Sequence, residues 1–502
     1  MNDVLTDRVR ATPDATALID AGSGREWSYA ELDTAVDRTA GRLAGLGIEP
    51  GDHLGCLLDT RPATVRLVHA ALRLGCVLVP LNTRLTPDQL ETRIERADLA
   101  GLICGADTEA NAVVASEIPV ASVDETEHTA VTALTDVEAI RFEPATRSRD
   151  DPCLMLATSG TTGRPKLVVL TVGNLVASAV ASAFRLGVLP GDRWLSPLSI
   201  YHMGGLAPIV RSALYGTTAV LVGEGGTGGN EGGGFDAATA RHVLAAYDCT
   251  GISLVPTMLR RLLDYGDLPD SLRFVLLGGA PASTGLIERC ARRNVPAYPT
   301  YGMTETASQV ATARPDEAFT HADTVGQPLF GTDLAVVDTA GERVDRGETG
   351  EIVVAGSTVF AGYYDDPDAT AAAFSADGFH TGDVGNRDAE GRLWVTGRLD
   401  ERIVTGGENV DPEAVADTLT AHPAVAEAVV VGLDDSEWGE RVGALVVSEG
   451  DLDAEAVQNY CRERLAGFEL PRTVGFVESL PRTASGTVKR DRVRELLRER
   501  GQ

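Results

Sequence analysis

Apolar runs of strand length alternate with helix-like stretches through the first 400 residues of this 502-residue chain. The stretch 29–48 has apolar residues at the 3.6-residue period of a helix, and 86–97 opens with threonine, proline and an acidic first turn, which are typical of a helix N-terminus. The runs 53–59 and 75–82 are apolar and have the length of strands. Strands that alternate with helices form largely parallel sheets, so we expect an α/β fold of stacked mixed or parallel sheets with helices.

The pattern changes near Asp400. Helical patterns at 412–420 and 453–465 enclose two apolar runs of strand length, and a charged helix is expected at the C-terminus. A chain of this length is too long for one ordinary core, and the last part has the size of a small α+β domain. We therefore expect two domains, at 1–397 and 398–502.

Composition excludes several classes of function. The formal net charge is −29 and is spread along the whole chain, whereas a nucleic-acid-binding domain would carry a basic surface. An acidic surface with few lysines is typical of proteins that work at high salt, so we expect a halophilic source.

The seven cysteines form no C-x-x-C pair, which argues against a disulfide framework or a thiolate metal site. We expect them to be buried thiols.

No secretory pattern opens the sequence, and no apolar run reaches about 18 residues. We therefore expect a cytoplasmic protein without a membrane span. The glycine-rich stretch 223–234 lacks the lysine and hydroxyl pattern of a phosphate-binding loop, and we expect a flexible surface loop.

A loop suited to phosphate follows the apolar run that ends at Ala157. The sequence TSGTTGRPK, Thr158–Lys166, offers hydroxyls, backbone N–H groups at glycines and one lysine, which are groups that hold phosphate oxygens. It does not match the Walker A pattern. Taken alone, the loop also fits an ordinary solvated connection.

Together with three further motifs, this loop resembles the adenylate-forming family of acyl-CoA synthetases, non-ribosomal peptide adenylation domains and luciferases. The segment 158–166 resembles the phosphate loop, 301–309 the adenine and magnesium segment, 381–383 the ribose segment and 397–410 the hinge segment. The four segments occur in the family's order, and the resemblance spans nearly the whole chain. It implies an ATP- and acyl-binding N-terminal domain and a mobile C-terminal domain that rotates about a hinge at Asp400.

The resemblance implies a nucleotide site. Tyr301 would stack on adenine, and Asp383 would accept hydrogen bonds from the ribose hydroxyls with Arg398 close by. Thr304 would meet the phosphates, and Glu305 would bind Mg²⁺, a cation that prefers carboxylate and phosphate oxygens. Each motif alone also fits a core aromatic or a turn cap. The implied cofactor-binding positions are Thr158, Ser159, Gly160, Thr161, Thr162, Gly163, Lys166, Gly279, Ala280, Pro281, Tyr301, Gly302, Thr304, Asp383, Arg398, Gly406 and Gly407.

The family's reaction has two halves. A carboxylate attacks the α-phosphate of ATP to give an acyl-adenylate and pyrophosphate, and a thiol, normally that of coenzyme A, then displaces AMP. Cations and oriented donors stabilise the negative charge of the first half. The resemblance therefore implies four catalytic residues, Lys166, Thr304, Glu305 and His202, and Lys489 is a fifth candidate whose position departs from the family's pattern.

The closing signature of the family carries a lysine after Gly486, but Thr487 occupies that position here. Lys489 stands two residues later, and in an extended segment such residues face the same side about 6–7 Å apart. Three alternatives stay open. Lys489 has taken over the role, adenylation relies on Lys166, Mg²⁺ and Arg398, or the protein does not adenylate.

The acyl segment 196–216 resembles that of the family, with two extra residues before His202, a candidate gate between the acyl and thiol sites. This stretch and the adenine segment most resemble the ligases that act on o-succinylbenzoate in menaquinone biosynthesis. That acid has two carboxylates, so Arg211 is the candidate partner of the unreacted one. Ser308 and Gln309 are candidates for bonding its oxygens.

Other functions stay open. A general aromatic or medium-chain acyl-CoA synthetase would have a neutral, deeper pocket. An enzyme that loads a carrier protein, or a non-catalytic nucleotide-binding regulator, would share the same motifs. The predicted small-molecule partners are a carboxylic acid, ATP with Mg²⁺, and coenzyme A, and a homodimer is one open alternative for the oligomeric state.

Overall fold

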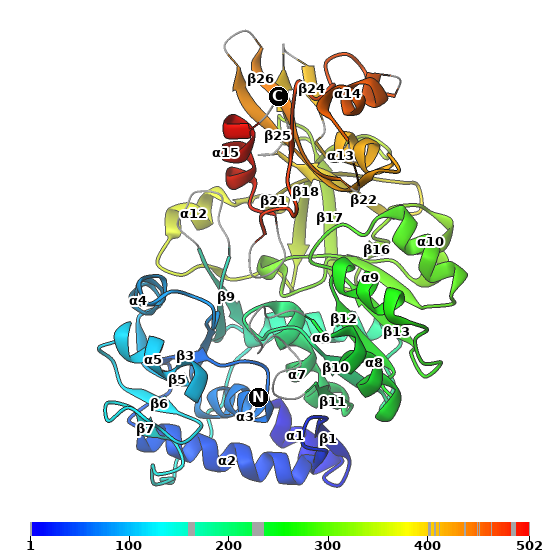
Figure 1. The fold of residues 1–502 in the computed structure, drawn as a ribbon. Coiled ribbons are helices and arrows are strands. Elements are labelled where there is room, and N and C mark those ends of the chain that lie inside the picture. The colour runs from blue at the N-terminus through cyan, green and yellow to red at the C-terminus, as the bar shows by residue number, and fades with distance from the viewer. Residues whose placement is uncertain are drawn as a thin grey trace. The chain divides into compact units, whose positions relative to one another are not determined.

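The computed structural model describes residues 3–158, 166–222, 235–399, 403–405, 408–410, 412–435, 438–448, 450, 452–462, 464–482 and 488–500. The chain divides into two compact units (Figure 1). The first contains 1–334 and 354–379, and the second contains 335–353 and 380–502.

A nine-stranded sheet in the first unit has the order β16-β15-β14-β13-β12-β10-β11-β1-β2. The central strands pair in parallel, and the pairs at both ends are antiparallel. Its strands are β1 (Thr16–Asp20), β2 (Arg25–Ser28), β10 (Arg193–Ser196), β11 (Thr218–Leu221), β12 (Gly251–Leu254), β13 (Phe274–Leu277), β14 (Ala297–Tyr301), β15 (Ala311–Thr312) and β16 (Gln327–Pro328).

An eight-stranded sheet in the same unit has the order β19-β9-β8-β4-β3-β5-β6-β7. It is parallel from β8 to β7, and β8, β9 and β19 pair antiparallel. Its strands are β3 (His53–Leu57), β4 (Val77–Pro80), β5 (Leu99–Cys104), β6 (Val120–Ser122), β7 (Thr132–Ala133), β8 (Pro152–Ala157), β9 (Leu167–Thr171) and β19 (Gly362–Tyr363).

Helices cover both sheets. The largest core cluster joins the two sheets to α1, α2, α3, α6 and α7, while α4 and α5 pack on the eight-stranded sheet and α8, α9 and α10 on the nine-stranded sheet. The helices of this unit are α1 (Val4–Ala11), α2 (Tyr29–Gly45), α3 (Pro62–Leu74), α4 (Pro87–Arg96), α5 (Ala106–Val114), α6 (Val172–Leu186), α7 (Met203–Tyr215), α8 (Ala237–Ala246), α9 (Pro256–Tyr265), α10 (Thr284–Arg292), α11 (Pro315–Thr320) and α12 (Pro367–Ala372), with a 3₁₀ turn η1 (Thr304–Thr306).

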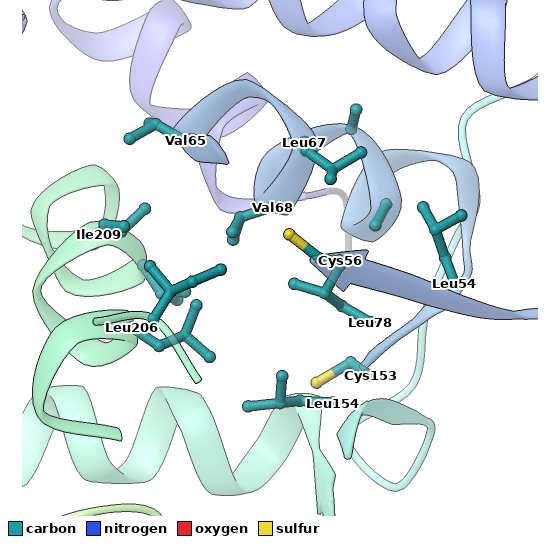
Figure 2. Packing of buried hydrophobic residues seen from close by; sticks show 14 of the residues in the cluster. Leu54, Cys56, Val65, Leu67, Val68, Leu78, Cys153, Leu154, Leu206 and Ile209 are labelled. Carbon is teal, nitrogen blue, oxygen red and sulfur yellow. The ribbon is translucent and has the colours of Figure 1, made fainter. Parts of the chain in front are cut away.

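All seven cysteines are buried and free, as predicted. Figure 2 shows Cys56 and Cys153 among the leucines and valines of β3, β4, α3 and α7. Burial raises the pKa of the Cys56 and Cys153 thiols to about 12, so these side chains remain neutral and behave as small apolar groups.

A five-stranded sheet runs through the division between the units, with the order β17-β18-β21-β20 and β22 paired to β21. Its strands are β17 (Thr332–Val337), β18 (Gly350–Gly356), β20 (Phe374–Ser375), β21 (Gly378–Arg387) and β22 (Leu393–Arg398). A second five-stranded sheet lies in the second unit, with the order β24-β23-β26-β25 and β27 paired to β26. Helices α13 and α14 pack on it within one core cluster and α15 within another. These elements are β23 (Ile403–Thr405), β24 (Glu408–Val410), β25 (Val425–Asp435), β26 (Gly439–Ser448), β27 (Thr473–Phe476), α13 (Pro412–Thr420), α14 (Ala454–Arg462) and α15 (Arg490–Arg500).

The predicted fold class is confirmed, and the predicted helices and strands form as α2, α4, α13, α14, α15, β3, β4, β25 and β26. Helix α4 begins, as predicted, with Thr86 as its N-cap and Pro87 in its first turn, and the Gln89 side chain completes a capping box with Thr86. The glycine-rich stretch 223–234 and the hinge residue Asp400 lie outside the described residues, so those predictions, like the domain boundary at 398, stay predictions. No helix within the described ranges is long and apolar enough to cross a bilayer.

Candidate active site

The ends of the predicted phosphate loop form a hairpin between β8 and β9. The Thr158 backbone N–H donates to the Lys166 carbonyl oxygen at 2.9 Å, and the Thr158 hydroxyl donates to the same oxygen at 3.4 Å. Ser159, Gly160, Thr161, Thr162 and Gly163 lie outside the described residues. The loop therefore leaves and re-enters the eight-stranded sheet at one point, with Lys166 at its end.

Two predicted residues, Lys166 and Glu305, meet at Tyr363. The Lys166 Nζ lies 4.5 Å from the centroid of the Tyr363 ring, and the Tyr363 hydroxyl donates to Glu305 Oε1 at 3.2 Å. Strand β19 pairs with β9 so that Tyr363 is opposite Val168, two residues after Lys166. Sequence reasoning missed Tyr363, because nothing in a short Gly-Tyr strand near 363 indicates which distant residues it contacts.

The adenine segment folds back on itself after β14. The Val310 N–H donates to the Tyr301 carbonyl oxygen at 2.8 Å, and the Ser308 N–H donates to that of Met303 at 3.2 Å. A Cβ at Gly302 would lie 1.7 Å from the Ser308 carbonyl oxygen, so only glycine fits there. Ser308 has a φ of 113°, a strained value for a residue other than glycine. This turn sets the positions of Tyr301 and of η1, which carries Thr304 and Glu305.

The predicted adenine-side turn lies beside this segment. Strands β13 and β14 are parallel neighbours, and Gly279, Ala280 and Pro281 are exposed just after β13. Gly279 has a φ of 78°, which favours glycine. Carboxyl ends of neighbouring parallel strands are a common place for ligands in α/β folds, and the turn and Tyr301 both lie at that end of their strands.

Arg211 is buried in α7, with 7% of its surface exposed. Its Nη1 donates to Ser182 Oγ at 3.3 Å and to Gln309 Oε1 at 3.0 Å, and its Nη2 donates to Ser178 Oγ at 2.7 Å. Arg211 forms no ion pair with any residue in the described part of the chain. Burial lowers the pKa of this guanidinium below its ordinary value.

The predicted substrate residue Gln309 is engaged at both ends. Its Oε1 accepts from Arg211, and its Nε2 donates to Thr312 Oγ1 at 2.9 Å, while the side chain is 1% exposed. Ser178 also donates to the Ala307 carbonyl oxygen at 2.6 Å. The acyl segment on α7 and the adenine segment after β14 are therefore joined through a buried polar network centred on Arg211.

His202 directly precedes α7. Its side chain is exposed and its ring lies 4.8 Å from that of Tyr201, edge to face. Desolvation by the surrounding protein lowers the pKa of the His202 imidazole. A Cβ at Gly205 would lie 2.4 Å from the carbonyl oxygens of Leu198 and Ser199, so the segment before His202 packs tightly on the start of the helix.

The ribose segment lies in the second unit. Asp383 is 7% exposed, and its Oδ1 accepts from Arg398 Nη1 at 2.9 Å across β21 and β22. The Thr381 hydroxyl accepts from the Asp383 N–H at 3.0 Å, and Glu351 Oε1 accepts from the Gly382 N–H at 3.1 Å. The predicted pair of Asp383 and Arg398 is thus in direct contact, while Gly406 and Gly407 lie outside the described residues.

Lys489 is exposed and stands directly before α15. Its backbone N–H donates to the Pro481 carbonyl oxygen at 2.8 Å, and its carbonyl oxygen accepts from the Val493 N–H at 3.1 Å. Thr487 lies outside the described residues, so the expectation that the two side chains share a face stays a prediction.

Two family models match this chain. The AMP-binding enzyme model matches residues 5–364, and the AMP-binding enzyme C-terminal domain model matches 414–487. The chain belongs to the AMP-binding enzyme family. The first match contains the phosphate-loop and adenine segments, whereas the ribose and hinge segments lie between the two matches. Lys489 stands just beyond the end of the second match.

Named relatives within the family match almost end to end. The 2-succinylbenzoate–CoA ligase of Bacillus licheniformis is 36% identical over 97% of this chain and 98% of its own. That of Bacillus velezensis is 38% identical over 98% of this chain and 97% of its own. Among solved structures, o-succinylbenzoate CoA synthetase (MenE) from Bacillus subtilis in complex with the acyl-adenylate intermediate OSB-AMP has a TM-score of 0.91 and 34% identity, covering 100% and 99% of the chains. ATP-bound MatB from Rhodopseudomonas palustris has a TM-score of 0.87 and 29% identity, covering 99% of each chain.

Proposed function

We propose that the protein is an ATP-dependent 2-succinylbenzoate–CoA ligase of the AMP-forming type. The observation that carries the substrate is Arg211, a buried cation that forms no ion pair with the described residues and sits beside the adenine segment. End-to-end similarity to ligases named for this acid supports the same conclusion. So does the likeness to a structure bound to its acyl-adenylate.

In the first half-reaction, one carboxylate oxygen of the acid attacks the α-phosphorus of ATP, and the bond to the bridging oxygen breaks to release pyrophosphate. The Tyr301 ring stacks on adenine, and Thr304 donates to a phosphate. Lys166, at the end of the phosphate loop, balances the charge on the phosphates. The Asp383 carboxylate accepts hydrogen bonds from the ribose hydroxyls, and its hydrogen bond from Arg398 holds the carboxylate in place.

The residues around Glu305 fit a magnesium ion. Glu305 offers a carboxylate whose Oε1 is oriented by the Tyr363 hydroxyl, on a turn that also carries Thr304. A carboxylate beside bound phosphates is the ligand set that Mg²⁺ prefers. When bound with ATP, the ion neutralises phosphate charge during the displacement. Magnesium in complex with ATP is named for one solved MenE structure from Bacillus subtilis.

In the second half-reaction, the thiol of coenzyme A attacks the carbonyl carbon of the acyl-adenylate, and AMP leaves with the electron pair of the broken bond while the thiol proton passes to solvent. His202, exposed before α7, is the gate between the acyl and thiol sites. Gly406 and Gly407 line the path of the thiol after rotation of the C-terminal domain about Asp400.

Lys166 and Lys489 are the only two lysines in the sequence, whereas lysine and arginine together number 44. A chain that uses arginine nearly everywhere else keeps lysine where a compact ammonium with rotatable donors differs in effect from a planar guanidinium. This distribution supports Lys489 as the cation of adenylation in place of the residue at Thr487. The exposed position of Lys489 before α15 is compatible with a side chain that approaches the phosphates when the domains close.

Arg211 would hold the carboxylate that does not react. A guanidinium has five N–H donors, three of which are engaged by Ser178, Ser182 and Gln309. The two remaining donors are the Nε–H and one Nη2–H, which together form an edge that matches a carboxylate. Gln309 then acts through Arg211, and Ser308 is left as the candidate contact to the keto oxygen.

Acid-dependent exchange between ATP and pyrophosphate tests the proposal. We expect exchange with 2-succinylbenzoate in molar KCl and much weaker exchange with benzoate or octanoate. Equal exchange with all three acids would indicate a general acyl-CoA synthetase. No exchange with any of them would refute the ligase and favour a nucleotide-binding regulator.

We further propose that the protein works in the cytoplasm of a halophile. The net charge of −29 supports a high-salt interior, because a screening length of about 3 Å at 1 M salt removes most self-repulsion. Seven free, buried thiols suit a reducing compartment. Light scattering in 0.1 and 2 M KCl would report the oligomeric state and its salt dependence.

A further inference from the structure

The segment 359–364 connects the two charged residues of the phosphate end of the site. The Phe360 N–H donates to the Glu305 carbonyl oxygen at 2.8 Å. The Tyr364 N–H donates to the Leu167 carbonyl oxygen at 2.8 Å, directly after Lys166. Backbone hydrogen bonds therefore fix one short segment to both the turn that carries Glu305 and the strand that follows Lys166.

The segment is held from its other side as well. Asn174 Nδ2 on α6 donates to the Val359 carbonyl oxygen at 2.8 Å, and the Tyr363 N–H donates to Thr370 Oγ1 at 2.9 Å. The Phe360 ring contacts that of Tyr363 at 4.8 Å and stacks on Phe374 at 5.5 Å. These contacts restrict the Tyr363 ring independently of its contacts with Lys166 and Glu305.

Tyr363 stands between a cation and an anion. Its ring face receives the Lys166 ammonium at 4.5 Å, and its hydroxyl donates to Glu305 Oε1 at 3.2 Å. Lys166 and Glu305 form no ion pair with each other in the described part of the structure. A lysine and a glutamate that approach the same phosphates attract each other, and a direct ion pair would take both from the ligand. An aromatic ring attracts an ammonium without neutralising it.

We propose that Tyr363 is a positioning residue for the phosphate end of the ATP site, which keeps Lys166 and Glu305 apart and aims them separately at phosphate and at Mg²⁺. This inference rests on the proposed ATP-dependent function. The hydroxyl orients the Glu305 carboxylate, and the ring holds the Lys166 ammonium. The two contacts make separate contributions, and two substitutions distinguish them.

The test compares Tyr363→Phe, which removes the hydroxyl that donates to Glu305 and keeps the ring, with Tyr363→Leu, which removes both the hydroxyl and the ring beside Lys166. Tyr364→Phe is the matched control, because the neighbouring ring packs on His53 and belongs to no proposed site. The dissociation constant of ATP is measured by titration calorimetry without any acid, once with EDTA and once with excess Mg²⁺. The ratio of the two constants gives the gain in affinity due to Mg²⁺, which is independent of turnover.

We expect Tyr363→Phe to bind ATP in EDTA within about twofold of the wild type and to lose about fivefold to tenfold of the gain due to Mg²⁺. Tyr363→Leu should also bind ATP several-fold more weakly in EDTA, and Tyr364→Phe should change neither value. A wild-type Mg²⁺ gain in Tyr363→Phe would overturn the inference. So would equal losses in EDTA for both Tyr363 variants, because that result indicates a general structural role. Failure of the proposed function looks different, since wild-type acid-dependent exchange would then be absent while the effects on ATP binding persist.

Discussion

Replacing Arg211 should separate acids with two carboxylates from acids with one. Arg211→Met removes the buried charge from α7 and keeps an unbranched side chain of similar reach. Its hydrogen-bond partners Ser178 and Gln309 keep other bonds, to the Ala307 carbonyl oxygen and to Thr312. The variant should therefore fold, and its losses should fall on the substrate.

The size of the effect follows from the donors that the structure leaves for a ligand. Among the described residues, the Nε–H and one Nη2–H of Arg211 have no acceptor. Hydrogen bonds to charged groups contribute about 1.5–3 kcal/mol each, so two contribute about 3–6 kcal/mol. At about 1.4 kcal/mol per factor of ten, kcat/KM for 2-succinylbenzoate should fall by about 10²- to 10⁴-fold. Arg211→Lys keeps the charge but loses the two-donor edge, so its loss should be about tenfold.

The assay is acid-dependent exchange of pyrophosphate into ATP, with 2-succinylbenzoate and benzoate compared for each variant. For benzoate, which has no second carboxylate, Arg211→Met should change kcat/KM by less than about threefold. Ser182→Ala serves as the control, because it removes one neutral partner of Arg211 and leaves the charge. An equal loss for both acids would refute the reasoning and show that Arg211 only supports the network between α7 and the adenine segment.

Three other predictions concern the lysine, a buried histidine and salt. Lys489→Ala should lower the rate of ATP–pyrophosphate exchange by about 10²-fold, which corresponds to about 2.7 kcal/mol of barrier. The dissociation constant of the acid, measured by calorimetry, should stay unchanged. Unchanged exchange in this variant would show that other cations support adenylation. Burial lowers the pKa of His69 to about 4, so the folded state favours the neutral imidazole. This contribution to the free energy of unfolding, about 3 kcal/mol at most, is fully present above pH 6.5 and should be lost as pH falls from 6.5 toward 4. Urea unfolding at pH 7.5 and 5 should show that loss in the wild type and much less in His69→Leu. The KM for ATP should fall as KCl rises from 0.1 to 2 M, because salt screens the repulsion between ATP and a protein of charge −29; a rising KM would contradict a long-range origin.

The fold was largely predictable because local signals dominate its elements. Helix α4 has both its capping threonine and its N1 proline where the sequence places them, and β25 and β26 follow uninterrupted apolar runs. The division of the chain into two compact units was harder to predict from the sequence. Strands β18 and β21 cross between the two units within one sheet, and no local composition marks where contacts between distant segments become sparse.

The candidate site was predictable where a motif carries its own geometry and not where partners come from far along the chain. Gly302 and Ser308 belong to one turn, so the adenine segment was recognisable from its letters. Tyr363 touches Lys166 only because β19 pairs with β9, a pairing across nearly 200 residues that no local pattern encodes. Arg211 was predicted as a charge for the substrate, but its burial and its bond to Gln309 depend on the packing of α6, α7 and the adenine segment.

The net negative charge of the chain and the buried Arg211 have different dependences on salt, and this difference bears on how an acidic chain uses anionic substrates. ATP, pyrophosphate, coenzyme A and a dicarboxylic acid are all repelled by a net charge of −29 in dilute buffer. That repulsion acts over the Debye length, which shrinks from about 10 Å at 0.1 M to about 3 Å at 1 M salt. Arg211 is buried, so salt would screen its proposed contact with a substrate carboxylate only a little. High salt therefore removes the long-range barrier and leaves the short-range attraction, so a strongly acidic protein can recognise an anion through an enclosed cation such as Arg211.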